Sequence, residues 1–508
     1  MILVALLLIL FLGGLLCWLG ERWGEAPPRW IALASLAAVL LLALGLWWQL
    51  DFQLAGAGAS PGASAWVLEW RAPWIPRFGI DFHLALDGLS LVLVALTGFL
   101  GILAVLCSWK EVRQGVGFFH LNLLFALGGV LGVFLAVDLF LFFVFWEMML
   151  VPMYFLIALW GHSEPGGKTS TYAAVKFFIY TQASGLLMLA AILALVFAHQ
   201  DQTGSYSFAY ADLLATSVPH ELGWLLMLGF FIAFAVKLPV VPFHGWLPDA
   251  HAQAPTAGSV LLAGILLKTG AYGLLRFALP LFPEASAQFA PMALTLGVLG
   301  VFYGAFLACG QRDIKRLIAY TSISHMGFVL IGLYSGSALA LQGVVMVMVA
   351  HGLSSAGLFL VGGQLYERLH TRDLNQMGGL WGRLGSLPGF GLAFAVAALG
   401  MPGTANFVGE FMVLFGSFPR APWAVVLASG GMILSAVYAL TLLQRVFFGP
   451  TQKSSPLDGM DAREYLMMLA TLALVLLFGL YPQPLLDTTE AVTSGIEALF
   501  DTGLGGGR

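Results

Sequence analysis

The stretch FFVFWEMML, residues 142–150, sets a single glutamate, Glu147, inside an unbroken apolar run. This run belongs to a longer apolar segment, residues 138–160, which can cross the roughly 30 Å hydrocarbon core of a bilayer as one helix. Similar segments fill nearly the whole chain, whose 508 residues are 60% hydrophobic and only 9% charged, against about 25% charged in a soluble domain. The sequence therefore predicts an all-α, polytopic membrane protein with a single transmembrane domain over residues 1–508.

The apolar segments predict about fourteen transmembrane helices joined by short connectors. The expected spans lie near 2–20, 30–49, 86–108, 116–136, 138–160, 173–198, 222–242, 256–279, 290–309, 314–334, 339–365, 387–416, 422–446 and 464–481. Two polar pieces, residues 50–84 and 199–221, are too short to form independent domains. The net charge of -4 is small, and it gives no reason to expect a nucleic-acid partner.

Positive charge falls mostly in alternate connectors. The connectors after odd-numbered helices hold Arg22, Arg29, Lys110, Arg113, Lys168, Arg312, Lys315, Arg316, Arg368, Arg372, Arg383, Arg445, Lys453 and Arg463. The connectors after even-numbered helices hold only Arg71, Arg77, Arg276 and Arg420. Because cytoplasmic connectors carry the excess of Lys and Arg, we expect both termini on the periplasmic side of a bacterial inner membrane.

Two expected spans carry an internal proline, Pro239 late in the seventh and Pro402 at the middle of the twelfth. Proline removes a backbone donor and clashes with the preceding turn, so both helices should be broken. The breaks lie five helices apart, and an odd offset implies opposite orientation in the membrane. We therefore expect two inverted five-helix repeats, helices 4–8 over about 116–279 and helices 9–13 over about 290–446. The alternative is that each proline is only a local kink.

Four charged side chains fall inside the expected spans: Glu147, Lys237, Lys268 and Glu410. Each would cost about 2.5–3.5 kcal/mol at mid-membrane, so each needs a partner or a hydrated cavity. They could be structural ion pairs between helices. Buried ion pairs stabilise little compared with apolar packing, so we favour sites that load and release protons.

Two histidines extend this polar set, His325 on the tenth span and His351 on the eleventh. Histidine suits proton shuttling because it can donate and accept near neutral pH. If Glu147 faces Lys237, a change in the charge of the carboxylate alters the proton affinity of the lysine. For either histidine, the alternative is a hydrogen-bonded core residue.

Other polar residues have simpler interpretations. Asp87 and Asp138 lie at expected helix starts, where aspartate caps the backbone. His244, Asp249 and His251 resemble a metal cluster at first sight. Their segment is short and flanked by prolines, so we expect it to line a proton pathway instead.

The three cysteines, Cys17, Cys107 and Cys309, have no paired spacing that indicates zinc or an iron–sulfur cluster. No nucleotide-binding glycine pattern follows a predicted strand. We therefore expect no cofactor and no metal on this chain, so that any redox cofactor belongs to other chains.

Two long motifs resemble a known family. The stretches KLPVVPFHGWLPDAHAQAPT (residues 237–256) and DIKRLIAYTSISHMG (residues 313–327) are similar to the hallmarks of the antiporter-like subunits of respiratory complex I, and the resemblance runs from Trp30 to Pro484. Glu410 favours the M-type branch, because the L and N types typically carry lysine there. The chain also ends after its fourteenth span, without the long lateral helix of the L type.

The resemblance implies a membrane subunit of NADH-quinone oxidoreductase that translocates protons while the complex transfers electrons from NADH to ubiquinone. FMN, iron–sulfur clusters and quinone would lie on other subunits, and L-type and N-type subunits would be neighbours in the membrane arm. The implied roles are Glu147 and Lys237 as a coupled pair, Lys268 as the central site, Glu410 as the outlet, and His325 and His351 along the axis between them. The alternatives are a subunit of a multi-chain cation/proton antiporter and a structural scaffold.

Overall fold

The computed structural model of the protein describes residues 1–50, 52, 66–163, 167–450 and 457–505, without the side chains of residues 502–505. Lys453, counted above among the connector cations, lies outside these residues. Among the described residues, thirteen helices are long and apolar enough to cross a membrane. One further span, residues 387–417, is divided into two short apolar helices. Together they give fourteen spans, the number that the sequence predicts.

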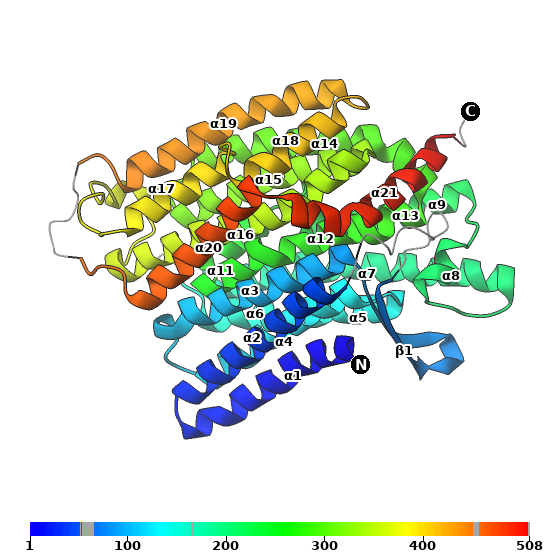
Figure 1. Ribbon diagram of the computed structural model, residues 1–508, viewed down its shortest axis with the longest axis horizontal. Coiled ribbons are helices and arrows are strands. Elements are labelled where there is room, and N and C mark those ends of the chain that lie inside the picture. Colours follow the sequence, from blue (N-terminus) through cyan, green and yellow to red (C-terminus); the bar gives the residue numbers. More distant parts are fainter. Residues whose placement is uncertain (51, 53–65, 164–166, 451–456, 506–508) are drawn as a thin grey trace.

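Each predicted span overlaps an observed one, and the spans run side by side along one direction (Figure 1). They are α1 (Ile2–Gly20), α2 (Ala26–Gln49), α3 (Gly88–Glu111), α4 (Val116–Leu135), α5 (Leu139–Met148) with α6 (Leu150–Trp160), α7 (Ser170–Thr203), α9 (His220–Lys237) with α10 (Leu247–Gln253), α11 (Thr256–Leu261) through α12 (Leu267–Gly273) to α13 (Leu279–Leu281), α14 (Pro283–Cys309), α15 (Ile314–Ser335), α16 (Ala338–Leu369), α17 (Leu387–Ala398) with α18 (Ala405–Ser417), α19 (Pro422–Val446) and α20 (Ala462–Leu480).

Both predicted helix breaks are present. Helix α9 ends at Lys237, and α10 begins only at Leu247. The second break separates α17 from α18, and there Gly400 and Gly403 adopt φ angles of 79° and 93°. Glycine tolerates this left-handed region because it lacks a Cβ. The proposed inverted repeat of the two halves stays a prediction.

The eighth span contains two π-helical turns that the sequence did not predict. The turns η4 (Leu262–Leu266) and η5 (Leu274–Ala278) flank α12, so that Lys268 lies on the short α-helical piece between them. A π turn is rare and often occurs at functional sites, because it shifts the facing of the residues that follow it. The span is therefore irregular on both sides of its buried charge.

The polar piece before α3 forms an antiparallel hairpin, β1 (Leu68–Ile75) with β2 (Ile80–Leu86). We predicted only a short soluble segment here. The strands lead directly into Asp87, which caps α3 by accepting a hydrogen bond from the backbone of Ser90 at 2.9 Å. Asp138 caps α5 in the same manner. Both predicted caps are confirmed.

Helix α21 (Gln483–Gly505) follows the last span and was not predicted. It packs against α3, α14 and α16 at the end of the bundle away from most positive connectors (Figure 1). Arg420 anchors it through Glu497 and Asp501, at 3.4 and 2.9 Å. The segment mixes apolar residues with threonines and acids, so its mean hydropathy gave no signal of a span.

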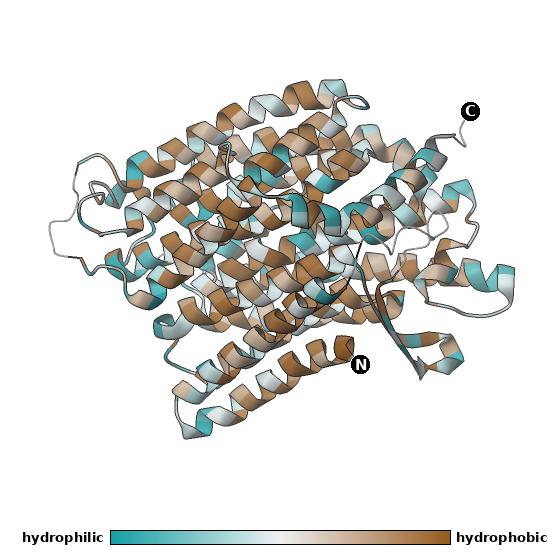
Figure 2. Ribbon diagram, in the orientation of Figure 1, coloured by the Kyte–Doolittle hydropathy of each residue, from teal (hydrophilic) through white to brown (hydrophobic). Residues whose placement is uncertain are grey.

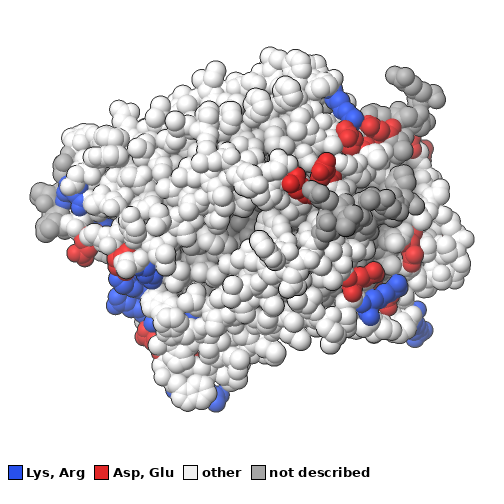
Figure 3. Space-filling model, in the orientation of Figure 1, with Lys and Arg blue, Asp and Glu red and all other residues white. Residues whose placement is uncertain are grey.

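The connectors rich in Lys and Arg gather at one end of the bundle. Lys110 lies 2.8 Å from Asp461, which joins the connectors after the third and thirteenth spans, and Arg372 lies 3.1 Å from Asp313, which joins those after the ninth and eleventh. Hydrophobic residues dominate the length of the helices (Figure 2). On the viewed face, charged side chains lie toward the two ends and along α21, and a broad uncharged region lies between them (Figure 3). This distribution fits a helical bundle that crosses a bilayer.

Candidate functional site

Lys237 occupies the last position of α9, at the first helix break, and its side chain is 0% exposed. Its Nζ lies 5.4 Å from the ring centroids of both Trp146 and Phe177. It has no hydrogen-bond partner among the described residues. A cation between aromatic faces is attracted by the negative charge of the rings. Gly270 brings α12 close to this break, because an added Cβ there would meet the Phe234 carbonyl oxygen at 2.7 Å.

Glu147 lies on α5 beside Trp146, the residue that covers Lys237. Its carboxylate packs against Gly185 of α7, where an added Cβ would overlap Oε1. Glu147 and Lys237 interact electrostatically, but within the described chain Oε1 and Nζ have no direct partner. The two predicted partners therefore lie near each other without forming a contact ion pair.

Lys268 and His351 make direct contact. Lys268 Nζ lies 2.7 Å from His351 Nδ1 and also donates to the carbonyl oxygen of Ala263. Both side chains are buried, at 0% and 1% exposure. Lysine offers only donors when charged, so the short contact requires an unprotonated Nδ1 or a neutral amine. One proton can therefore belong to either residue of this pair.

His325 connects this pair to Glu410. The centroids of the His325 and His351 rings lie 5.5 Å apart, and His325 Nδ1 lies 2.7 Å from Glu410 Oε1. Four of the six predicted residues thus form one row, from Lys268 through His351 and His325 to Glu410. Lys237 packs against Gly270, two residues beyond Lys268, and so lies next to the start of the row.

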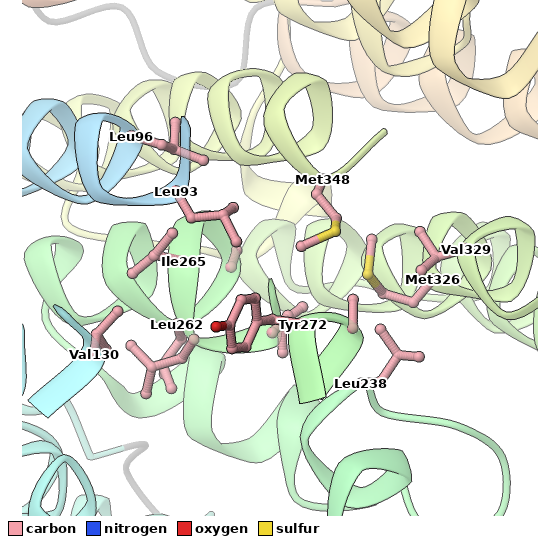
Figure 4. Close-up of a cluster of buried hydrophobic side chains, with 14 of the residues drawn as sticks. Leu93, Leu96, Val130, Leu238, Leu262, Ile265, Tyr272, Met326, Val329 and Met348 are labelled. Atoms are coloured by element: carbon pink, nitrogen blue, oxygen red, sulfur yellow. The ribbon is translucent and has the colours of Figure 1, made fainter. Parts of the chain in front are cut away.

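Buried apolar side chains lie close to these residues along the chain. Figure 4 shows a buried cluster that includes Leu238, next to Lys237, together with Ile265, Met326 and Met348 from the spans that carry Lys268, His325 and His351. Each of these side chains lies within three residues of one of the charged or histidine residues along the chain. Polar groups in such surroundings can exchange protons only with each other or with enclosed water.

Tyr438 is a member of the site that the sequence did not single out. Its hydroxyl lies 3.1 Å from His325 Nε2, on the side of the ring opposite Glu410. One turn earlier on α19, the Ser435 hydroxyl donates to the carbonyl of Leu399 at the second helix break, at 3.2 Å. The spacing of Ser435 and Tyr438 places two polar groups on one helix face, which was the signal available in the sequence.

The three residues that resemble a metal cluster point to different partners. The Asp249 carboxylate binds Lys168, Lys176 and Arg316 at 2.6, 2.8 and 2.9 Å. His251 stacks on a phenylalanine of α16, and His244 meets the edge of a tyrosine. Among the described residues, no group of His, Cys, Asp and Glu is arranged to hold a metal ion.

Residues 136–435 match the model of a protein family, whose description is "NADH:quinone oxidoreductase/Mrp antiporter, TM". This range is more than half of the chain, and it contains the whole row together with Glu147 and Lys237. The chain belongs to the NADH:quinone oxidoreductase/Mrp antiporter family. The family that the two motifs indicated is thereby confirmed.

Relatives that match this chain over nearly their whole length support its place in the NADH:quinone oxidoreductase/Mrp antiporter family. NADH-quinone oxidoreductase subunit M of Pseudomonas aeruginosa is 62% identical over 498 residues, which cover 98% of this chain and 97% of that protein. The subunit of the same name from Escherichia coli K12 is 62% identical over 503 residues, 98% of each.

Solved structures share the fold. A chain of respiratory complex I from Thermus thermophilus with bound NADH superposes with a TM-score of 0.84 at 32% identity, over 97% of this chain and 99% of that one. A chain of the Mrp complex from Dietzia has a TM-score of 0.82 at 19% identity, over 98% and 100%. At 19% identity, the likeness to the Mrp chain shows the shared fold alone.

Proposed function

We propose that the chain is the proton-translocating, M-type membrane subunit of an NADH-quinone oxidoreductase, respiratory complex I. The observation that carries this proposal is the buried row from Lys268 to Glu410, in which neighbouring groups lie 2.7 Å apart at both ends. A purely structural set of charges would be expected to pair directly. Instead, Lys237 and Glu147 each keep a polar atom with no hydrogen-bond partner in the described chain.

Protons would move along the row by short transfers. Lys268 gives its proton to His351 Nδ1, and the imidazole releases a proton from Nε2 toward His325. His325 takes up that proton at Nε2 and passes the one on Nδ1 to the Glu410 carboxylate. The Tyr438 hydroxyl, at Nε2 of His325, selects the tautomer that keeps a proton on Nδ1. The protonation states of Glu147 and Lys237 determine the net charge next to Lys268, where the row starts.

Coupling to electron transfer would depend on other subunits. We place FMN, the iron–sulfur clusters and the quinone site on other chains, and L-type and N-type antiporter-like subunits beside this one. The 62% identity to subunits M supports this arrangement over a free-standing cation/proton antiporter. The likeness to an Mrp chain at 19% identity is compatible with both a complex I subunit and an antiporter subunit.

We place this multi-pass chain in the bacterial inner membrane with both termini on the periplasmic side. The gathering of the Lys- and Arg-rich connectors at one end of the bundle supports this orientation.

The test replaces Lys268 by methionine, which preserves length and removes the exchangeable proton. In vesicles that contain the intact complex, we expect NADH-driven proton uptake to fall at least about tenfold, since positioned proton donors contribute factors of about 10²–10⁴. Arg22→Ala, at an exposed connector residue, is the control and should pump normally. Normal pumping by an assembled Lys268→Met complex contradicts the proposal.

A further inference from the structure

Gln364 of α16 is 5% exposed, and neither its Nε2 nor its Oε1 has a hydrogen-bond partner among the described residues. Burying an amide without partners is unfavourable, so such groups normally bind protein or enclosed water. Gln364 lies near the end of the bundle that carries the positive connectors, one turn before Arg368. None of the steps proposed above uses it.

A small cavity lies against this amide. Its volume is about 10 Å³, about that needed for one water molecule. Its polar lining residues are Cys107, Thr256, Gln364, Glu367, Arg463 and Glu464. The cavity thus has the size and the polar partners that a buried water requires.

The outer wall of the cavity is charged and reaches solvent. Arg463 lies 3.4 Å from Asp461, which in turn binds Lys110 at 2.8 Å, and the Lys110 side chain is 58% exposed. Partial burial alone would raise the pKa of Asp461, but hydrogen bonds from Lys110 and from the Glu464 backbone lower it to about 2. This acid therefore stays ionised at physiological pH, and the charged rim persists.

From the inner wall of the cavity, a line of neighbouring side chains runs along α16. His351, Ser355, Phe359, Gly363 and Glu367 follow one another at intervals of four residues, so each is next to the following one on the helix surface, and the line winds partway around the helix. From Glu367 to His351 this line extends about 24 Å along the helix, at 1.5 Å per residue.

His251 packs against this line of side chains between the cavity and the row. Its ring stacks on Phe359, with centroids 4.5 Å apart. The ring is 0% exposed, and neither nitrogen has a hydrogen-bond partner in the described chain. His251 also interacts electrostatically with two buried lysines, Lys315 and Lys268. On the cavity side, Gly363 lets Thr256 approach closely, because an added Cβ would meet its Oγ1 at 2.6 Å.

We propose that the cavity between α3, α11, α16 and α20 binds water and is the intake through which protons reach Lys268, by way of Gln364 and His251. The proposal rests on the proposed function of the chain. A hydrated proton passes from water at Gln364 to one ring nitrogen of His251. The other ring nitrogen releases its proton to neutral Lys268, and the water is left neutral.

The first experiment measures NADH-driven proton uptake by the intact complex in vesicles. Gln364→Leu removes the water-binding amide at similar volume and should lower uptake several-fold, whereas Gln364→Glu keeps water-binding oxygens and should retain it. Gln342→Leu makes the same change near the other end of α16 and should pump normally. Normal pumping by Gln364→Leu overturns the proposed intake.

A second variant addresses the inner step. His251→Phe preserves a ring that stacks on Phe359 but carries no proton, so uptake should also fall several-fold, and normal uptake contradicts the route. Lys268→Met is measured in parallel. If Lys268→Met lowers uptake and the other two variants do not, only the intake is wrong; if all three pump normally, the proposed function itself fails.

The position of buried water tests the intake even if a variant does not assemble. In a high-resolution structure of the unmodified complex, water bound to Gln364 and Thr256 supports the intake. A cavity that is dry at a resolution where other buried waters are seen overturns it.

Discussion

Nδ1 of His325 lies 2.7 Å from Oε1 of Glu410, and the two side chains are 3% and 2% exposed. A histidine and a glutamate at this distance share a hydrogen bond whose proton can belong to either partner. At the other end of the row, Lys268 and His351 lie equally close. Between the two short contacts, the histidine rings, whose centroids lie 5.5 Å apart, form the one step in the row without a direct hydrogen bond.

Glu410→Gln should abolish passage through the end of the row. The amide can still hydrogen-bond to His325, but it cannot take up and release a proton at neutral pH. We expect NADH-driven proton uptake to fall at least about tenfold while the complex still assembles. Glu497→Gln, on α21 at the bundle surface, is the control with the same chemical change. Equal uptake by the two variants would exclude Glu410 from the pathway.

Tyr438→Phe removes a single hydroxyl and the hydrogen bond to His325. A hydrogen bond is worth about 1 kcal/mol, so we expect the pumping rate to fall about fivefold. Tyr334→Phe is the matched control, because the Tyr334 ring is equally buried and its hydroxyl has no partner among the described residues. Rates are compared in vesicles with equal amounts of complex. A loss of rate in both variants would indicate general damage and not a role of the Tyr438 hydroxyl.

Exchanging the charges of Glu147 and Lys237 should not restore function. In the double variant a carboxylate would occupy the position of the lysine between Trp146 and Phe177. The faces of aromatic rings carry negative charge and disfavour an anion. We expect Glu147→Lys combined with Lys237→Glu to pump no better than either single variant. Full activity in the exchanged pair would favour a structural ion pair.

The buried pair between Arg276 and Asp87 should matter for stability. Both side chains are at most 4% exposed. Removing one partner of such a pair costs about 3–5 kcal/mol, because the other charge stays buried alone. Arg276→Met should therefore lower the denaturation temperature of the solubilised complex. Arg71→Met breaks an exposed pair with Asp81 and should cost about 1 kcal/mol or less. Similar losses in both variants would contradict this account.

Much of the site could be predicted because charge inside an apolar span is conspicuous. Glu147, Lys237, Lys268 and Glu410 were each visible as single residues against their own helix. An order could be proposed for them, but their contacts could not, since the one between Lys268 and His351 joins residues 83 positions apart. Tyr438 was missed for a related reason: a tyrosine in a span looks like an ordinary aromatic residue until His325, 113 positions away, is placed beside it.

The fold, like the site, was predicted only where the signal is local in the sequence. Pro239 and Pro402 predicted the two breaks because proline acts on the local backbone. The hairpin at 68–86 and helix α21 lack long apolar runs, so hydropathy gave no signal for them. The hydropathy pattern also gives no signal for the π turns on either side of Lys268, because these turns depend on how the neighbouring helices pack around the span.

Helix α21 has a consequence for the order in which the chain is made. Its Thr488 carbonyl lies directly against Gly88, where an added Cβ would overlap it, at the start of α3 and beside Asp87. About 370 residues separate the end of α3 from α21, and a ribosome needs roughly 20–70 s to add them. Through that interval the start of α3 remains uncovered in the nascent protein. A chain that stalls before Gln483 thus displays a surface that the finished subunit hides, and membrane proteases could recognise that surface.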